Sequence, residues 1–201
     1  QAALLAEALL AQGRNVRKIS FPNYESDSSA LVKMYLNGEF GTDPGDVNGY
    51  AASAFFAVDR FASFRKDWGA FYHSGGIVIA DRYTTSNAVH QCCKLPKAEW
   101  DAYLGWLFDF EYRLMGIPAP DTVFYLQVDV EESQRLLRAR YDGDEGKKDI
   151  HEANIDYLLH SQAAAEYCAD TLGWKRIRCY QGGKMRGIED IHAEILALLT
   201  I

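Results

Sequence analysis

The sequence predicts an α/β fold, specifically a three-layer, doubly wound parallel sheet flanked by helices. Strand-like apolar runs alternate with longer segments of helical periodicity along the 201 residues. The most apolar run, Ile77–Ala80, is continuous rather than alternating, which is typical of a strand buried on both faces. With 48% hydrophobic and 24% charged residues, the composition is that of an ordinary globular protein. We therefore expect a single domain over residues 1–201.

Each expected element follows from its local pattern. Apolar runs predict four strands, at Val16–Phe21, Ile77–Ala80, Thr122–Val128 and Lys175–Cys179. Helical periodicity predicts seven helices, at residues 1–12, 28–37, 46–73, 97–114, 131–141, 151–172 and 188–200. The glycine pair at 75–76 ends the long third helix, as a helix C-terminus requires.

The start of the chain does not fit this fold. Gln1 to Leu10 has a helical pattern with no strand before it. In a doubly wound sheet such a helix follows a central strand, and loss of that strand would leave backbone groups of both neighbours unpaired. We expect a first strand to precede residue 1.

The charge balance limits the partners. With 28 acidic and 21 basic side chains the formal net charge is −7, so general nucleic-acid binding is not expected. A bound anion must be held by a local cluster of Arg and Lys. No apolar run reaches the ~20 residues of a membrane span, so no membrane association is expected. The cysteines contain no C-x-x-C pair, which favours a reduced chain in the cytoplasm.

Asp81-Arg82-Tyr83 directly follows the most apolar strand. Ligands of open α/β sheets bind outside the carboxyl ends of the strands. An acid and an arginine at that position can hold a metal ion and an anion together. The alternative is an ion pair on the surface at the end of a strand.

Phe56, Asp59 and Arg60 lie within the third predicted helix, and spacings of three and four residues place them on one helix face. A ring and a guanidinium one turn apart can stack on a base and bind a phosphate. The alternative is a core phenylalanine beside a surface charge pair.

An arginine-rich helix precedes a polar segment rich in Gly, Asp and Lys. The basic side chains are Arg135, Arg138 and Arg140, and the segment runs from Tyr141 to Lys148. A mobile lid that closes over phosphates has this composition, and so does an ordinary solvated loop. Near the first strand, Phe21-Pro22 marks an extended turn.

Taken together, these segments resemble the thymidylate kinase family of nucleoside monophosphate kinases. The residues that carry the resemblance are Phe21-Pro22, Phe56 to Arg60, Asp81-Arg82-Tyr83 through Ser86-Asn87, and the arginine-rich helix with its lid. The resemblance implies a P-loop kinase fold and a homodimer. It implies transfer of the ATP γ-phosphoryl group to thymidine 5′-monophosphate (dTMP) with Mg²⁺. The family's glycine-rich phosphate loop would lie before Gln1.

The resemblance also implies roles for individual residues at the acceptor site. Phe56 would stack on thymine and Arg60 would contact the base. Arg82 would bind the acceptor phosphate, and Asp81 would act on the metal indirectly, through water. The other substrate-binding residues would be Phe21, Pro22, Tyr83, Ser86, Asn87 and His90. His90 stands where many members have an aromatic ring near the sugar.

The resemblance places a lid at about residues 138–150. Arg138 and Arg140 would act catalytically on the migrating phosphoryl group, with Arg135 and Lys147 as further lid cations. Two other readings remain open. A deoxynucleoside kinase would need a carboxylate base for the 5′-hydroxyl, for which Glu25 is available. A non-catalytic nucleotide-binding protein would lack the donor loop.

Overall fold

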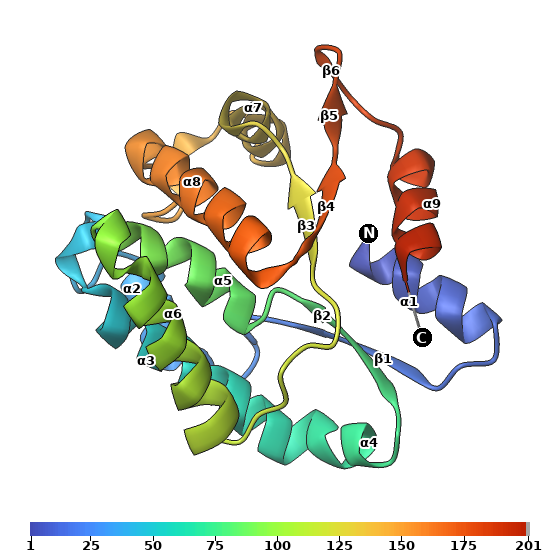
Figure 1. Cartoon of the computed structure of the whole chain (residues 1–201). Helices are drawn as coiled ribbons and strands as arrows, with labels where there is room; N and C mark the ends of the chain where they lie inside the picture. The colour runs from blue at the N-terminus through green and yellow to red at the C-terminus, as the bar shows by residue number, and fades with distance from the viewer. Residues whose placement is uncertain (200–201) are drawn as a thin grey trace.

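The computed structural model describes residues 1–199 of the chain, and it has a mixed α/β fold (Figure 1). Strand β1 (Val16–Ser20) pairs in parallel with β2 (Ile77–Asp81). Strand β3 (Phe124–Gln127) pairs in parallel with β4 (Lys175–Arg178). All four predicted strands are therefore confirmed, each within a few residues of the expected ends. An unpredicted antiparallel hairpin, β5 (Tyr180–Gln181) with β6 (Lys184–Met185), follows β4.

The strands do not form the single sheet that was expected. Among the described residues each of β1 to β4 has one ladder partner, so the two parallel pairs remain separate. A continuous sheet would require hydrogen bonds from one pair to the other. The structure thus confirms an α/β fold with short parallel pairs, and this part of the prediction is corrected.

Helices cover both faces of the strands. Helices α1 (Ala2–Ala11) and α9 (Ile188–Leu198) lie together at one side of the molecule (Figure 1). Their buried leucines and isoleucines pack with Ile77 and Ile79 of β2. Val78, whose side chain points the opposite way, packs in a cluster with Phe64 and Trp68.

The remaining α-helices form the opposite layer and its edges. They are α2 (Ala30–Leu36), α3 (Gly49–Ser63), α4 (Gly69–His73), α5 (Thr84–His90), α6 (Trp100–Phe108), α7 (Val130–Arg140) and α8 (Ile155–Leu172). Short 3₁₀ turns lie at Asp27–Ser29, Pro44–Asp46, Cys92–Lys94, Lys97–Glu99 and Glu145–Lys147. Helix α5 was not predicted.

The long helix predicted at 46–73 is three segments. It begins at Gly49, where the Asn48 side chain accepts a hydrogen bond from the backbone N–H of Ala51. After Ser63 it widens into a π-helical turn, Phe64–Trp68. The next residue, Gly69, has no room for a side chain, because a Cβ there would lie 2.5 Å from the carbonyl oxygen of Phe64. A second π-helical turn, Asp109–Leu114, extends α6.

The helix predicted from residue 151 begins later, at Ile155. Asn154 is its N-cap and accepts from the backbone N–H of Tyr157 at 2.9 Å. Residue 200, the predicted end of the last helix, lies outside the described residues. In the part of the chain that the structure describes, no helix combines the length and apolarity needed to cross a membrane.

Candidate functional site

Glu111 organises the site, although no sequence motif singled it out. Its side chain is fully buried on the π-helical turn after α6. The guanidinium of Arg60, on α3, donates to it twice, from Nε at 2.7 Å and from Nη2 at 2.6 Å. Thr84 Oγ1 donates at 2.8 Å and Asn87 Nδ2 at 3.4 Å, both from α5. One carboxylate therefore joins three elements.

The surface charge pair considered for Asp59 and Arg60 is wrong, because both side chains are buried. Asp59 accepts hydrogen bonds from the backbone N–H of Asn23 at 2.8 Å and from Ser28 Oγ at 2.6 Å. It thereby fastens the loop after β1 to α3. Contact of Arg60 with a base stays a prediction.

Arg82 lies at the carboxyl end of β2 in a strained backbone conformation, with φ of +64°. Left-handed backbone is uncommon for a residue with a side chain and is concentrated at functional sites. Its Nη1 lies 3.4 Å from Nε2 of His90. Among residues 1–199 Asp81 and Arg82 form no ion pair with each other, so the surface ion pair considered for them is not observed.

Arg82 also faces the loop after β1 and the end of the lid. Burial raises the pKa of Asp149, and the Arg82 guanidinium acts in the opposite direction. Burial and the Asp149 charge raise the pKa of Tyr24, and Arg82 again opposes them. These three side chains therefore share one electrostatic environment.

A run of four rings links Phe56 to Arg82, and we name it the aromatic arc: Phe56, Tyr35, His151 and His90. The Phe56 ring, half-buried, meets Tyr35 edge-on at 6.3 Å between centroids. Tyr35 contacts His151 at 5.3 Å, and His151 stacks on His90 at 5.7 Å. Two predicted site residues, Phe56 and His90, are thus the two ends of the aromatic arc.

Lys94 contacts the aromatic arc at Tyr35. Its Nζ donates to Tyr35 Oη at 2.7 Å and lies 4.8 Å from the centre of the Tyr35 ring. Tyr35 Oη lies 2.7 Å from Nε2 of His151. Burial lowers the pKa of Lys94 to about 8. Burial, with Arg82 and Lys94 nearby, lowers the pKa of His90 to about 3, so its imidazole is neutral at pH 7.

Three of the other predicted acceptor residues are buried. Phe21 and Tyr83 are buried and pack together at 6.0 Å, and the Phe21–Pro22 peptide bond is cis. Asn87 is buried and also donates to the carbonyl of Ser53 at 3.2 Å. Ser86 is half-buried on α5. Substrate contact by these residues stays a prediction.

The predicted lid cations lie on α7 and in the segment that follows it. Arg138 and Arg140 are exposed on the last turn of α7, and Arg135 Nε donates to Glu132 at 2.8 Å. Lys147 lies 3.8 Å from Asp144. The C-terminal end of the lid is anchored, because the backbone N–H of Ile150 donates to the carbonyl of Leu36 at 3.3 Å.

The carboxylates of the structure can be compared with what the expected Mg²⁺ ion requires. No group of three His, Cys, Asp or Glu side chains gathers within the described part of the chain. Mg²⁺ in phosphoryl-transfer sites needs only one or two carboxylates, because water and substrate phosphates complete its shell. Asp81 is exposed at the end of β2 and suits such an indirect role.

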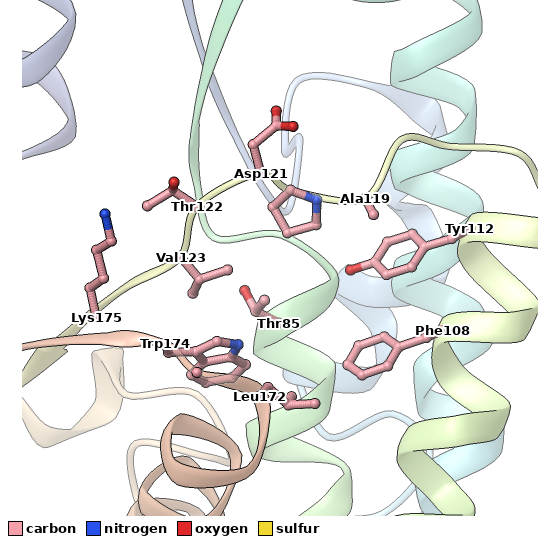
Figure 2. A pocket seen from close by; sticks show the side chains of 12 residues that line it. Thr85, Phe108, Tyr112, Ala119, Asp121, Thr122, Val123, Leu172, Trp174 and Lys175 are labelled. Atoms are coloured by element: carbon pink, nitrogen blue, oxygen red, sulfur yellow. The ribbon is translucent and has the colours of Figure 1, made fainter. Parts of the chain in front are cut away.

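A cavity of about 230 Å³ lies apart from the aromatic arc (Figure 2). Phe108, Tyr112 and Trp174 supply aromatic surface to it, and Thr85 of α5 lines one side. Lys175 extends away from these rings in Figure 2. None of the predicted site residues lines this cavity.

Comparison with known proteins gives consistent results. The sequence model described as thymidylate kinase matches residues 1–183. A thymidylate kinase of Mycobacterium tuberculosis (strain H37Rv) is 30% identical over 173 residues, which cover 85% of this chain and 78% of that protein. A probable thymidylate kinase of Thermococcus gammatolerans is 27% identical over 201 residues, covering 99% of this chain and 88% of that protein. One of Thermococcus kodakarensis is 25% identical, with 99% and 89% covered.

Replacement of Glu111 by alanine tests the buried ion pair. We expect the free energy of unfolding to fall by about 3–5 kcal/mol, because Arg60 would be left charged and unpaired in the core. The matched control is Asp109→Ala on the same π-helical turn, where the pair with Arg113 is exposed and contributes little to stability. Urea unfolding measures both, and equal losses would contradict the assignment.

Replacement of His90 by phenylalanine tests its burial in the neutral state. The folded-state pKa lies below the unfolded value of about 6.5, so below that pH the unfolded chain binds the extra proton. Stability should therefore fall as the pH falls from 7 to 5. Since the ring is not fully buried, we expect His90→Phe to remove about 1–2 kcal/mol of that loss. Urea unfolding at the two pH values measures it, and an unchanged pH dependence would contradict the burial.

Proposed function

The chain belongs to the thymidylate kinase family. We propose that it transfers the γ-phosphoryl group of ATP to dTMP with Mg²⁺, giving dTDP and ADP. The observation that carries the proposal is the aromatic arc, which runs from a half-buried phenylalanine to a strained arginine at the carboxyl end of a parallel strand. A nucleotide needs both features, an aromatic ring for its base and a cation for its phosphate.

The base would lie at Phe56. Stacking on an aromatic side chain contributes about 1–3 kcal/mol per base and suits any planar heterocycle. Selectivity for thymine would come from Asn87 and Arg60, whose positions are fixed by Glu111. Phe21, Pro22 and Tyr83 would shape the pocket around the acceptor.

The reaction needs no strong general base from the protein. The second pKa of a phosphate monoester is about 6, so the acceptor already presents a nucleophilic oxygen at neutral pH. The task is alignment and charge stabilisation. Arg82, which has a left-handed backbone at the end of β2, would hold the acceptor phosphate.

The metal and the lid would act on the donor side. Mg²⁺ when bound neutralises charge on the donor phosphates, and Asp81 would orient its water ligands. Arg138 and Arg140, with Arg135 and Lys147 nearby on the lid, would stabilise charge on the migrating phosphoryl group. Their exposed positions allow the lid, residues 138–150, to approach from solvent.

We further propose one kinase domain of the P-loop NTPase class over residues 1–201, acting in the cytoplasm as a homodimer. The dimer proposal is supported by apolar side chains exposed on α3. Val58 is 47% exposed and Phe61 36% exposed on this helix, and Tyr50 at its start is 38% exposed. A second copy could bury these side chains.

The first test is ADP release from ATP and Mg²⁺ with dTMP, dUMP or thymidine as acceptor. We expect turnover with dTMP, because the phosphate end of the arc requires a monophosphate. Turnover with thymidine alone would indicate a deoxynucleoside kinase that uses Glu25 or another base. Binding of dTMP without any turnover would indicate a non-catalytic nucleotide-binding protein.

Replacement of Arg82 by alanine should lower turnover with dTMP by about 10²-fold or more, because the alignment and neutralisation of the acceptor phosphate are lost. The melting temperature should stay near that of the parent. Arg14→Ala, in the exposed loop before β1, is the matched control. Near-normal turnover of the Arg82 variant would refute the role.

Replacement of Phe56 by alanine should weaken dTMP binding by about 1–3 kcal/mol through loss of stacking. Phe55→Ala is the control, since this neighbouring ring packs against Tyr35 and Phe40. Calorimetry gives both affinities. If the two variants bind dTMP equally, Phe56 serves only the core.

A further inference from the structure

Lys94 is a half-buried cation with no carboxylate partner. It lies on the 3₁₀ turn Cys92–Lys94, shortly after α5. Among the described residues it forms no ion pair, and its Nζ donates instead to Tyr35 Oη at 2.7 Å and to the carbonyl oxygen of Val47 at 2.9 Å. Removal of a charge from water costs free energy, and a carboxylate partner normally offsets that cost. Two neutral acceptors offset less of it, so stability alone does not account for a lysine at this position.

The hydroxyl oxygen of Tyr35 connects Lys94 with His151. The Tyr35 side chain is buried, and its Oη lies 2.7 Å from Nε2 of His151 and 3.4 Å from the carbonyl oxygen of Pro44. The ammonium can only donate to this oxygen, which leaves the Tyr35 proton for one of two acceptors. If the proton goes to His151, Nε2 accepts it, and if it goes to Pro44, Nε2 of the imidazole donates to Oη. In both arrangements Tyr35 and His151 are hydrogen-bonded, and Lys94 holds the oxygen that joins them.

His151 is the residue that directly follows the predicted lid. Its backbone N–H donates to Oδ1 of Asp149 at 2.8 Å, so the two residues form one local turn. The backbone N–H of Ile150, between them, donates to the carbonyl oxygen of Leu36 on α2 at 3.3 Å. The His151 ring lies 5.3 Å from the Tyr35 ring, also on α2. The hydrogen bond between His151 and Tyr35 is therefore the side-chain contact that holds this end of the lid against α2, beside the backbone contact of Ile150.

We propose that Lys94 is a positioning residue for phosphoryl transfer: through the Tyr35 hydroxyl it holds His151, and with it the C-terminal end of the lid, against α2. The inference rests on the proposed function, in which the lid cations act on the migrating phosphoryl group. The Lys94 ammonium is directed at Tyr35 and Val47, so it acts through them and not on the nucleotide. Loss of Lys94 therefore lowers the fraction of molecules that have the lid cations in place, whereas the contacts of dTMP with Phe56 and Arg82 stay.

The first test is steady-state turnover of dTMP by Lys94→Met, which keeps a side chain of similar length and removes the donor. We expect kcat to fall about tenfold, the scale of one hydrogen bond to a charged group, with the KM for dTMP within about threefold of the parent. Tyr35→Phe keeps the ring contacts with Phe56 and His151 and removes the hydroxyl, so the same fall is expected. The double variant should lose no more than either single variant, because both changes remove one connection.

The second test needs no turnover. Trypsin cleaves after the arginines and lysines of residues 138–150, and the rate of this cleavage, followed by mass spectrometry, reports how firmly the lid is held. We expect Lys94→Met to raise the rate by about threefold or more, because local opening of the lid becomes more frequent. Lys97→Met, at an exposed position of the next 3₁₀ turn, is the matched control and should change neither turnover nor cleavage.

Unchanged kcat and unchanged cleavage in folded Lys94→Met would overturn the inference, and so would additive losses in the double variant or a raised KM with a normal kcat. If Lys94→Met melts at a much lower temperature than the parent, Tyr35→Phe provides the deciding measurement. Failure of the inference is distinguishable from failure of the proposed function. Normal turnover by the parent with neither effect in the variants refutes the role of Lys94 alone. A parent without turnover, in which Lys94→Met still accelerates lid cleavage, refutes the kinase activity and supports the anchoring of the lid.

Discussion

The arrangement of the site depends on one buried carboxylate. Glu111 accepts hydrogen bonds from Arg60, Thr84 and Asn87, and so joins α3, α5 and the π-helical turn after α6. Two desolvated charges are costly, and the cost is offset only where geometry is good and the remaining lone pairs are satisfied. Here the guanidinium binds in a two-point fork and two neutral donors complete the carboxylate. This contact therefore fixes how α5, which carries Asn87 and His90, lies relative to α3, which carries Phe56.

The aromatic arc depends in turn on a second polar contact, between α2 and the end of the lid. Tyr35 of α2 contacts Phe56 on one side and His151 on the other, and Lys94 donates to its hydroxyl. A phenylalanine there would preserve the ring contacts but would lose the hydrogen bonds that orient His151. The polar groups of the aromatic arc are therefore the Tyr35 hydroxyl and the two imidazoles, and the hydroxyl orients one of them. The two ends differ in chemistry because one is Phe56 and the other is His90.

The sequence predicts the strands well because apolar runs such as Ile77–Ala80 have few other interpretations. It does not predict α5, since Thr84 to His90 is short, polar at its start and has no apolar stripe. Nor does it predict Glu111, because an acid within a helical pattern normally lies in solvent. The Gly182-Gly183 pair is the kind of two-residue signal that could have predicted the β5–β6 hairpin. The single continuous sheet was wrong for residues 1–199, since pairing between strands is a non-local property that periodicity does not contain.

The two groups of predicted cations lie in different backbone settings, although the whole chain carries a net charge of −7. Arg82 is exposed at a strand end, with a left-handed backbone and the His90 ring beside its guanidinium. The arginines of α7 instead precede a turn in which Asp142 and Gly143 have positive φ, and Asp144, Gly146 and Lys147 after it are exposed. Beyond that segment the chain is anchored again, because His151 contacts Tyr35 and Asn154 Nδ2 donates to Asp43 at 3.3 Å. His151 thus belongs both to the root of the lid and to the aromatic arc. Under the proposed function, a nucleotide bound along the arc would therefore meet His151, the residue that directly follows the predicted lid.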